Sequence, residues 1–382
     1  MSAPLHVVYV IDSLAPGGAE SSLAAMAPGL VSRGVRLDVL ALTARPGLQD
    51  ALRNGGATVT EVGGSRRTWW RQVHALVRER RPDLVHTTLF EADLAGRVGA
   101  RLAGTPVVST LANDAYGPAH RSEHRPRHYR LRAAQLSDAV TARLAARLHA
   151  VSTHVADVMA RRLRYPRARI DVIPRGRDPD ALGRRTRERC DRVRERLGVS
   201  PETPLVIAVA RQEHPKGLDV LIETLPDVLR HIPAARVIVA GRPGNATTSL
   251  HEQLLRVDGA KALEFLGARS DVADLLCASD VFVLPSRREG LPGALLEAMA
   301  LECPVVVSDL PQIREVVDGA TALLVPPEDP RALGAAVVRA LADPTSARGR
   351  ALAARRRFIE HFTIDAIADQ MICFYRRALR SP

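Results

Sequence analysis

Two successive series of βαβ signals constrain this chain more than any other feature of its sequence. In each series, short β-branched runs that end in Gly, Pro or Asp alternate with Ala-, Leu- and Arg-rich segments at helical spacing, the pattern of parallel sheets covered by helices. The first series predicts strands at 6–11, 37–41, 84–87, 106–109, 149–151 and 170–173. The second predicts strands at 205–210, 236–240, 263–266, 281–284, 304–308 and 322–325. We therefore expect an α/β protein with two doubly wound domains and a ligand cleft along the carboxyl ends of both sheets.

The segment between the two series predicts the domain boundary. Residues 174–204 have Gly and Pro at their ends and an Arg/Glu-rich helix at 186–197, which breaks the alternating pattern. We expect a first domain over 1–178, a linker over 179–204 and a second domain over 205–359. A helix over about 360–382 is expected to pack back on the first domain. The length of 382 residues suits two domains that each bury a core.

Several patterns that the chain lacks argue against other classes of protein. Its first residues carry no basic segment, and no apolar stretch reaches the roughly 18 residues of a membrane-spanning helix. We therefore expect a cytoplasmic protein, with a peripheral position at the inner face of the cell membrane left open. The four cysteines are far apart, so they predict neither a zinc site nor a disulfide framework. Because the chain lacks a paired Asp cluster and the G-x-G-x-x-G spacing, we expect no metal and no dinucleotide cofactor.

The positive charge is concentrated in the first half of the chain. Residues 1–178 hold 26 Lys and Arg against 15 Asp and Glu, which accounts for nearly all of the net charge of +12. This asymmetry indicates an anionic partner such as an acidic glycan or a lipid head group, with a general bias toward Arg as the alternative. The Arg-rich segment 121–132 is the candidate contact with anionic lipid or a polyprenyl-phosphate-linked glycan. Aromatic residues make up only 3%, which argues against nucleic-acid binding by base stacking.

The segment 286–300 is the most specific chemical signal. It reads Ser-Arg-Arg-Glu-Gly-Leu-Pro-Gly-Ala-Leu-Leu-Glu-Ala-Met-Ala and follows the strand predicted at 281–284. A Gly-rich turn before a helix that opens with Pro292 presents unpaired backbone amides, which can bind phosphate. Glu289 on the turn and Glu297 in the helix can accept hydrogen bonds from the hydroxyls of a ribose or a hexose. The alternative is a pair of solvated glutamates, but the apolar neighbours of Glu297 predict a buried carboxylate that needs partners.

With Glu-x7-Glu in this setting, the segment resembles the GT4 family of retaining glycosyltransferases, which have the GT-B fold of two Rossmann-like domains. The stretch 209–222, Val-Ala-Arg-Gln-Glu-His-Pro-Lys-Gly-Leu-Asp-Val-Leu-Ile, is similar to the Arg/Lys segment that opens the second domain of that family. The resemblance implies that Arg211 and Lys216 neutralise the donor diphosphate and stabilise the leaving nucleotide. It also implies that Glu297 binds the ribose, while Glu289 and the adjacent loop hold the sugar and the phosphate. The loop residues are Gly290, Leu291, Pro292 and Gly293.

The first domain carries weaker parts of the same resemblance. The segment 12–20 contains Gly17 and Gly18 and is similar to the family's Gly-Gly loop, which approaches the donor phosphate and the acceptor. Many relatives have a His near the reacting sugar, after the strand that corresponds to 106–109, where this chain has Asn113. Asn113 can donate a hydrogen bond to a sugar hydroxyl, but it cannot carry a proton.

Two histidines and two further segments of this domain also bear on the comparison with the family. His86 and His120 are candidate substitutes for the missing His, with a structural role as the alternative. The segments 149–153 and 172–176 also match the family, which more often has Asn where Arg175 stands.

The resemblance implies a hexosyltransferase that uses a nucleotide-diphosphate sugar and retains the anomeric configuration without a protein nucleophile. The implied acceptor is a glycan, a glycolipid or a polyprenyl-linked molecule in cell-envelope or exopolysaccharide synthesis. Two alternatives stay open: a catalytically silent homologue that binds sugar nucleotide, and an epimerase or hydrolase on the same fold. An epimerase or hydrolase would release free nucleotide without any acceptor.

Overall fold

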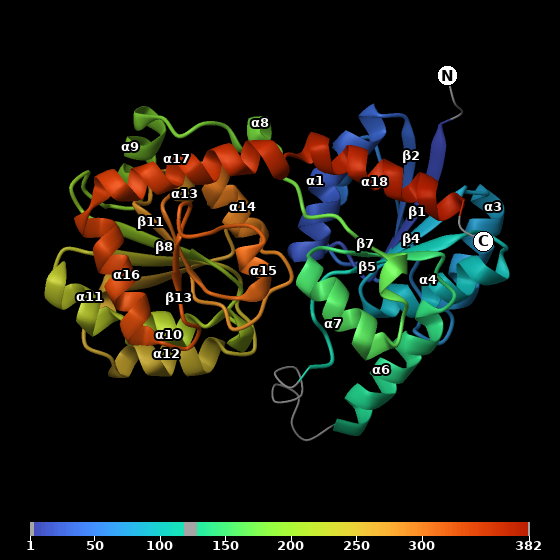
Figure 1. The fold of residues 1–382 in the computed structure, drawn as a ribbon, viewed down its shortest axis with the longest axis horizontal. Helices are drawn as coiled ribbons and strands as arrows, with labels where there is room; N and C mark the ends of the chain where they lie inside the picture. The colour runs from blue at the N-terminus through green and yellow to red at the C-terminus, as the bar shows by residue number, and fades with distance from the viewer. Residues whose placement is uncertain (1–3, 118–127, 381–382) are drawn as a thin grey trace. The chain divides into compact units, whose positions relative to one another are not determined.

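The computed structural model describes residues 4–117 and 128–380 and divides into two compact units (Figure 1). Unit 1 comprises the chain up to Arg177 together with Ile364 onward, and unit 2 comprises Asp178–Thr363. No helix among the described residues is long and apolar enough to cross a membrane.

Unit 1 is built on a seven-stranded parallel sheet with the order β3-β2-β1-β4-β5-β6-β7. Its strands are β1 (Leu5–Ile11), β2 (Val35–Ala41), β3 (Thr58–Glu61), β4 (Leu84–Thr88), β5 (Val107–Leu111), β6 (Arg147–Ala150) and β7 (Ile170–Val172). The six strands predicted from the sequence are all present. The missed strand, β3, lies at the sheet edge and is largely exposed, so it lacks the apolar run by which a buried parallel strand is recognised.

The helices of unit 1 bury apolar residues against both faces of this sheet. They are α1 (Gly18–Ser32), α2 (Gln49–Asn54), α3 (Trp69–Arg80), α4 (Phe90–Leu102), α6 (His128–Ala142), α7 (Thr153–Leu163) and α18 (Ile364–Leu379). The short helix η1 (Arg167–Arg169) precedes β7. Figure 1 shows α18 lying along α1, and a Cβ at Gly29 would lie 3.2 Å from the Cβ of Ala368, so the two helices pack closely there. Helix α18 therefore completes the core of the unit to which β1 belongs.

Unit 2 is built on a six-stranded parallel sheet with the order β10-β9-β8-β11-β12-β13. Its strands are β8 (Leu205–Val209), β9 (Arg236–Ala240), β10 (Leu263–Gly267), β11 (Val281–Leu284), β12 (Val305–Ser308) and β13 (Leu323–Val325). All six were predicted. Its helices are α8 (Pro179–Leu182), α9 (Arg187–Arg196), α10 (Leu218–Glu223), α11 (Leu225–His231), α12 (Thr247–Arg256), α13 (Val272–Ala278), α14 (Gly293–Ala300), α15 (Pro311–Arg314), α16 (Pro330–Ala342) and α17 (Pro344–His361), with short helices η2 (His214–Lys216) and η3 (Ala260–Ala262).

The segment 179–204, expected to be a linker, contributes α8 and α9 to unit 2. On α9, Arg189 Nε donates to Asp274 Oδ1 at 2.6 Å, and Arg194 Nη2 donates to Asp280 Oδ2 at 2.7 Å. Arg194 is buried and also donates to three backbone carbonyls of the loop 200–203. These bonds fix α9 against α13, so this part of the chain has a defined place in the unit.

Candidate functional site

The loop between β11 and α14 in unit 2 holds a buried carboxylate at the carboxyl end of the sheet. Glu289 is 7% exposed, and its Oε1 accepts hydrogen bonds from Lys216 Nζ and Ser286 Oγ, both at 2.7 Å. Among the described residues, both bonds to this carboxylate end on Oε1. The other oxygen, Oε2, accepts no hydrogen bond from the described residues.

Lys216 reaches Glu289 because two turns touch each other. The helix η2 ends on Gly217, whose backbone has the left-handed φ of 63°. A Cβ at Gly217 would lie 2.0 Å from the carbonyl oxygen of Pro285, so only glycine allows this approach. The amide of Arg287 also donates to the carbonyl of Pro215 at 2.9 Å. Two residues 73 positions apart in the chain are thus brought into an ion pair.

Arg211, the second predicted cation, lies at the carboxyl end of β8. Its Nη1 donates to Glu213 Oε1 at 2.5 Å, and its side chain is 42% exposed. The structure therefore pairs each of the two predicted cations with a glutamate. It brings Lys216, but not Arg211, into contact with Glu289.

A buried glutamine that the sequence analysis did not identify holds the backbone of the same loop. Gln312, at the start of α15, is 3% exposed, and its Nε2 donates to the carbonyl oxygen of Glu289 at 3.0 Å. Its Oε1 is buried without a hydrogen-bond partner among the described residues. Gln312 follows the carboxyl end of β12, and this position in a doubly wound domain is the signal that could have identified it.

The remaining predicted donor-site residues surround the amino end of α14. Gly290, Leu291 and Pro292 are buried, and Gly293 begins the helix. Pro292 is the N-cap, and no side chain caps the helix there, so the first amides of α14 are available to an anion. Glu297 lies half-buried within α14.

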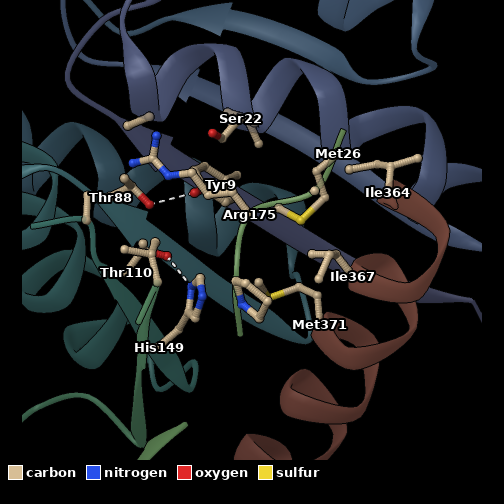
Figure 2. Close-up of a pocket in the computed structure, with 16 residues that line it drawn as sticks. Tyr9, Ser22, Met26, Thr88, Thr110, His149, Arg175, Ile364, Ile367 and Met371 are labelled. Carbon is tan, nitrogen blue, oxygen red and sulfur yellow. Dashed lines mark hydrogen bonds between the residues drawn. The ribbon is translucent and has the colours of Figure 1, made fainter. Parts of the chain in front are cut away.

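Unit 1 contains a cavity of about 40 Å³ at the carboxyl ends of its central strands (Figure 2). Apolar side chains of α1 and α18, such as Met26, Ile367 and Met371, form one side. Arg175 is the only charged residue among the described ones that line it. The residues lining the cavity are Tyr9, Ala19, Ser22, Leu23, Met26, Thr88, Thr110, Ala112, His149, Val151, Pro174, Arg175, Gly176, Ile364, Ile367 and Met371.

A chain of hydrogen bonds runs beneath this cavity and has one consistent direction. His149 Nε2 lies 2.8 Å from the carbonyl oxygen of Ile173 and must donate to it, so His149 Nδ1 accepts from Thr110 Oγ1 at 2.9 Å. Thr110 then accepts from His86 Nε2 at 2.6 Å, and His86 Nδ1 accepts from Tyr375 at 2.8 Å. Burial lowers the pKa of His149 to about 4 and that of His86 well below its usual value. We therefore expect both imidazoles to be neutral, and both ring nitrogens of His86 are engaged in hydrogen bonds within unit 1.

The predicted Gly-Gly loop lies at the edge of the same cavity. Gly17 is the N-cap of α1, and Gly18 is its first residue. Arg175 Nη1 donates to the carbonyl oxygen of Gly18 at 2.7 Å, and a Cβ at Gly18 would lie 2.9 Å from this nitrogen. Arg175, which stands where relatives more often have Asn, therefore fixes the position of the loop.

Asn113 is exposed in the turn that follows β5. At the end of β1, burial and then the like charges of Glu91 and Glu20 raise the pKa of Asp12 to about 6. His120 and the Arg-rich residues 121–127 lie outside the described residues. Within 4–117 and 128–380, no group of three or more His, Cys, Asp or Glu side chains is arranged to hold a metal ion.

Two sequence profiles match this chain. The profile described as glycosyltransferase family 4 matches residues 16–181, and that of glycosyl transferases group 1 matches residues 203–343. The first match falls in unit 1 apart from its last residues, and the second lies in unit 2.

Named relatives match over different lengths. The 2-deoxystreptamine N-acetyl-D-glucosaminyltransferase of Streptomyces fradiae is 30% identical over 85% of this chain and 75% of the relative. The UDP-Gal:alpha-D-GlcNAc-diphosphoundecaprenol alpha-1,3-galactosyltransferase of Escherichia coli is 28% identical over 62% of this chain and 60% of the relative. The D-inositol 3-phosphate glycosyltransferase of Kineococcus radiotolerans is 33% identical over 49% of this chain and 47% of the relative. In the last two matches, this chain spans less than two thirds of the relative's length.

Solved structures share the fold over nearly the whole chain. Anabaena Alr3699/HepE in complex with UDP and glucose has a TM-score of 0.86 at 22% identity, covering 98% of this chain and 100% of that one. Sucrose-phosphate synthase from Thermosynechococcus elongatus has a TM-score of 0.80 at 19% identity, covering 99% and 100%. These likenesses, together with the two parallel sheets, confirm the predicted α/β fold of the GT-B class.

Proposed function

Because this chain belongs to glycosyltransferase family 4, we propose that it is a retaining enzyme that transfers a hexose-type sugar from a nucleotide diphosphate to an acceptor hydroxyl. The contact between Lys216 and Glu289 at the carboxyl end of β11 is the observation that carries this proposal. It combines a cation suited to a phosphate with a buried carboxylate that has one oxygen available for sugar hydroxyls. The UDP and glucose named for the Anabaena structure support a ligand of this kind.

In the proposed reaction, the acceptor oxygen attacks the anomeric carbon on the face from which the nucleotide leaves. The bond between that carbon and the phosphate oxygen breaks with its electron pair, and the leaving diphosphate takes the acceptor's proton. Negative charge then grows on the diphosphate, where Lys216, Arg211 and the first amides of α14 stabilise it. Both cations already pair with a glutamate, so a bound diphosphate would compete with Glu289 and Glu213 for them.

We assign the other predicted residues to positions around this reaction. Glu289 Oε2 would accept from the sugar hydroxyls, and Glu297 would bind the ribose. Gly290 to Gly293 would hold the phosphate, as would the loop of Gly17 and Gly18. Asn113 would donate to the sugar from the turn after β5. Because arginine, lysine and backbone amides supply the positive charge, we expect transfer without a metal or another cofactor.

The cavity in unit 1 is our candidate for the acceptor side of the site. Its lining combines apolar walls with the hydroxyls of Tyr9, Thr88 and Thr110, and its single charged residue is Arg175. This lining suits a neutral or anionic acceptor group better than an ammonium group. We propose a glycan, a glycolipid or a polyprenyl-linked molecule in cell-envelope or exopolysaccharide synthesis as the acceptor. A lipid-linked acceptor would place the protein in the cytoplasm at the inner face of the membrane.

A thermal-shift panel of nucleoside diphosphates and nucleotide sugars tests the donor site. Binding raises the unfolding midpoint by mass action, so one nucleotide should stabilise the wild type and not Glu297→Ala. Incubation of that nucleotide sugar with candidate acceptors should then yield product with the anomeric configuration of the donor, both with and without EDTA. Stabilisation by no nucleotide would contradict the proposal.

Two further outcomes identify the alternatives. Release of free nucleotide without any acceptor would indicate an epimerase or a hydrolase. Tight donor binding without transfer to any acceptor would indicate a catalytically silent homologue, an alternative motivated by Asn113 in place of the family's His.

A further inference from the structure

Helix α6 of unit 1 carries an apolar stripe that faces solvent. Tyr129, Leu136 and Val140 are 67%, 66% and 54% exposed, and their spacings of seven and four residues place them on one side of the helix. Asp138 lies on the opposite side, where Arg97 of α4 donates to its Oδ1 at 2.6 Å. Helix α6 is therefore fixed to the unit by its buried side. Leu136 and Val140 are exposed on the other side, together with Tyr129, whose hydroxyl accepts from the adjacent Arg130 Nε at 3.2 Å.

A groove of about 400 Å³ extends this apolar surface across α4 toward α3. Ser137 and Thr141, each next to a residue of the stripe, form the α6 side of the groove. Leu94, Val98 and Leu102 form the α4 side, and Leu102 is 58% exposed. Trp70 of α3 also lines the groove, and the guanidinium carbon of Arg71 lies 5.1 Å from the centre of its ring.

The charged side chains that accompany the stripe are arginines. Arg130, Arg132 and Arg143 are exposed on or just beyond α6, and Arg101 is exposed beside Leu102. The acid of this helix, Asp138, is buried and neutralised by Arg97. At the groove, Glu91 pairs with Arg66 at 2.9 Å. The surface is thus apolar at its centre and positively charged around it.

We propose that this surface binds an anionic lipid membrane. We call it the α4–α6 face and define it by Leu102, Tyr129, Leu136, Val140 and the arginines at 101, 130, 132 and 143. Apolar and aromatic side chains would enter the boundary between head groups and acyl chains, while the arginines contact lipid phosphates. A symmetric contact with a second copy would instead set the arginines of one protomer against those of the other, which is repulsive. The inference deepens the membrane position proposed above by naming the surface that makes the contact, and its test does not depend on the transfer reaction.

Co-sedimentation of the full chain with vesicles tests this surface. The wild type should bind vesicles that contain phosphatidylglycerol, bind little to pure phosphatidylcholine, and dissociate as salt is added. The double variant Leu136→Ser/Val140→Ser should bind at least about tenfold more weakly because it removes the apolar insertion. Arg132→Glu/Arg143→Glu should also lose about tenfold or more, and its remaining binding should depend less on salt.

A matched control lies in unit 2, where Leu255 is 84% exposed next to the exposed Arg256. Leu255→Ser/Arg256→Glu makes the same chemical changes away from the α4–α6 face and should bind vesicles like the wild type. Equal loss in this control, equal binding to both vesicle types, or no binding by the wild type would overturn the proposal. A wild type that dimerises and a Leu136→Ser/Val140→Ser variant that stays monomeric, without vesicle binding, would assign the face to a second copy instead.

Discussion

Glu289 is held at both of its ends by other residues of unit 2. Lys216 and Ser286 donate to the same carboxylate oxygen, while Gln312 donates to the backbone carbonyl. A residue fixed in this way loses little conformational freedom when a ligand binds, which favours affinity. The arrangement also separates two tasks, because one carboxylate oxygen is used for structure and the other stays available.

Gln312→Leu should weaken donor-sugar recognition without unfolding the protein. The substitution removes the bond to the Glu289 carbonyl, which lowers the free energy of unfolding by about 1 kcal/mol. It also removes the buried Oε1 that has no partner among the described residues, which raises the free energy of unfolding by about the same amount. We expect a free energy of unfolding within about 1 kcal/mol of the wild type. We also expect a several-fold fall in the affinity for a nucleotide sugar relative to its nucleoside diphosphate, measured by titration calorimetry. The neighbouring Ile313→Val should cost about 1 kcal/mol and leave that ratio unchanged. An unchanged ratio in Gln312→Leu would remove Gln312 from the site.

The neutral His149 should make the stability of the protein depend on pH. Its pKa is lowered to about 4 in the folded state, so the unfolded chain binds more protons below about pH 6.5. The free energy of unfolding is therefore unaffected by His149 above about pH 6.5. It falls by up to about 3 kcal/mol as the pH drops from there toward 4. Urea unfolding at a series of pH values should show this slope in the wild type and a shallower one in His149→Phe. The exposed His231→Gln should leave the slope unchanged, and a flat wild-type profile would contradict the assigned protonation state.

At the scale of elements, the site depends on contact between the η2 turn and the loop after β11. Gly217 and the carbonyl of Pro285 approach so closely that a methyl group does not fit. The contact places Lys216 and Glu289 opposite each other although each belongs to a different βα unit.

Gly217→Ala should disrupt this contact. The new Cβ would lie 2.0 Å from the Pro285 oxygen at a φ of 63°, so we expect a loss of about 2 kcal/mol or more in the free energy of unfolding. Donor affinity should fall as well, because the ion pair cannot keep its geometry. Gly319→Ala is the control, since Gly319 has open space around it and a Cβ there would meet nothing within 4 Å. Similar stability of the two variants in thermal and urea unfolding would show that the contact between the two turns is dispensable.

The alternation of apolar runs and helical segments predicted nearly all of the elements because each buried parallel strand has a continuous apolar signature. β3 was missed because it is an edge strand whose first and last residues are exposed, and Val59 is its single apolar residue, packed half-buried against the core. The candidate site was predicted where a motif follows a strand, as with Glu289. Gln312 and Arg175 were not predicted as contacts of Glu289 and Gly18, because each contact joins segments that are distant in the chain and depends on strand order.

At the scale of the whole molecule, each unit has its own apolar core. We therefore expect two calorimetric transitions, of which a bound nucleotide should raise the one that belongs to unit 2. Gly217→Ala should lower that same transition, whereas His149→Phe should lower the other. A single transition that every variant shifts equally would show that the units unfold together.

The return of α18 to unit 1 has a consequence for how the chain folds during synthesis. The core of unit 1 includes Ile367, Met371 and Tyr375, and these residues leave the ribosome after all of unit 2. The continuous segment 178–363 is complete before them. We therefore expect unit 2 to complete its fold while the core of unit 1 is still partly open and exposed to aggregation. This order is the reverse of the usual one, in which the domain that is synthesised first also folds first.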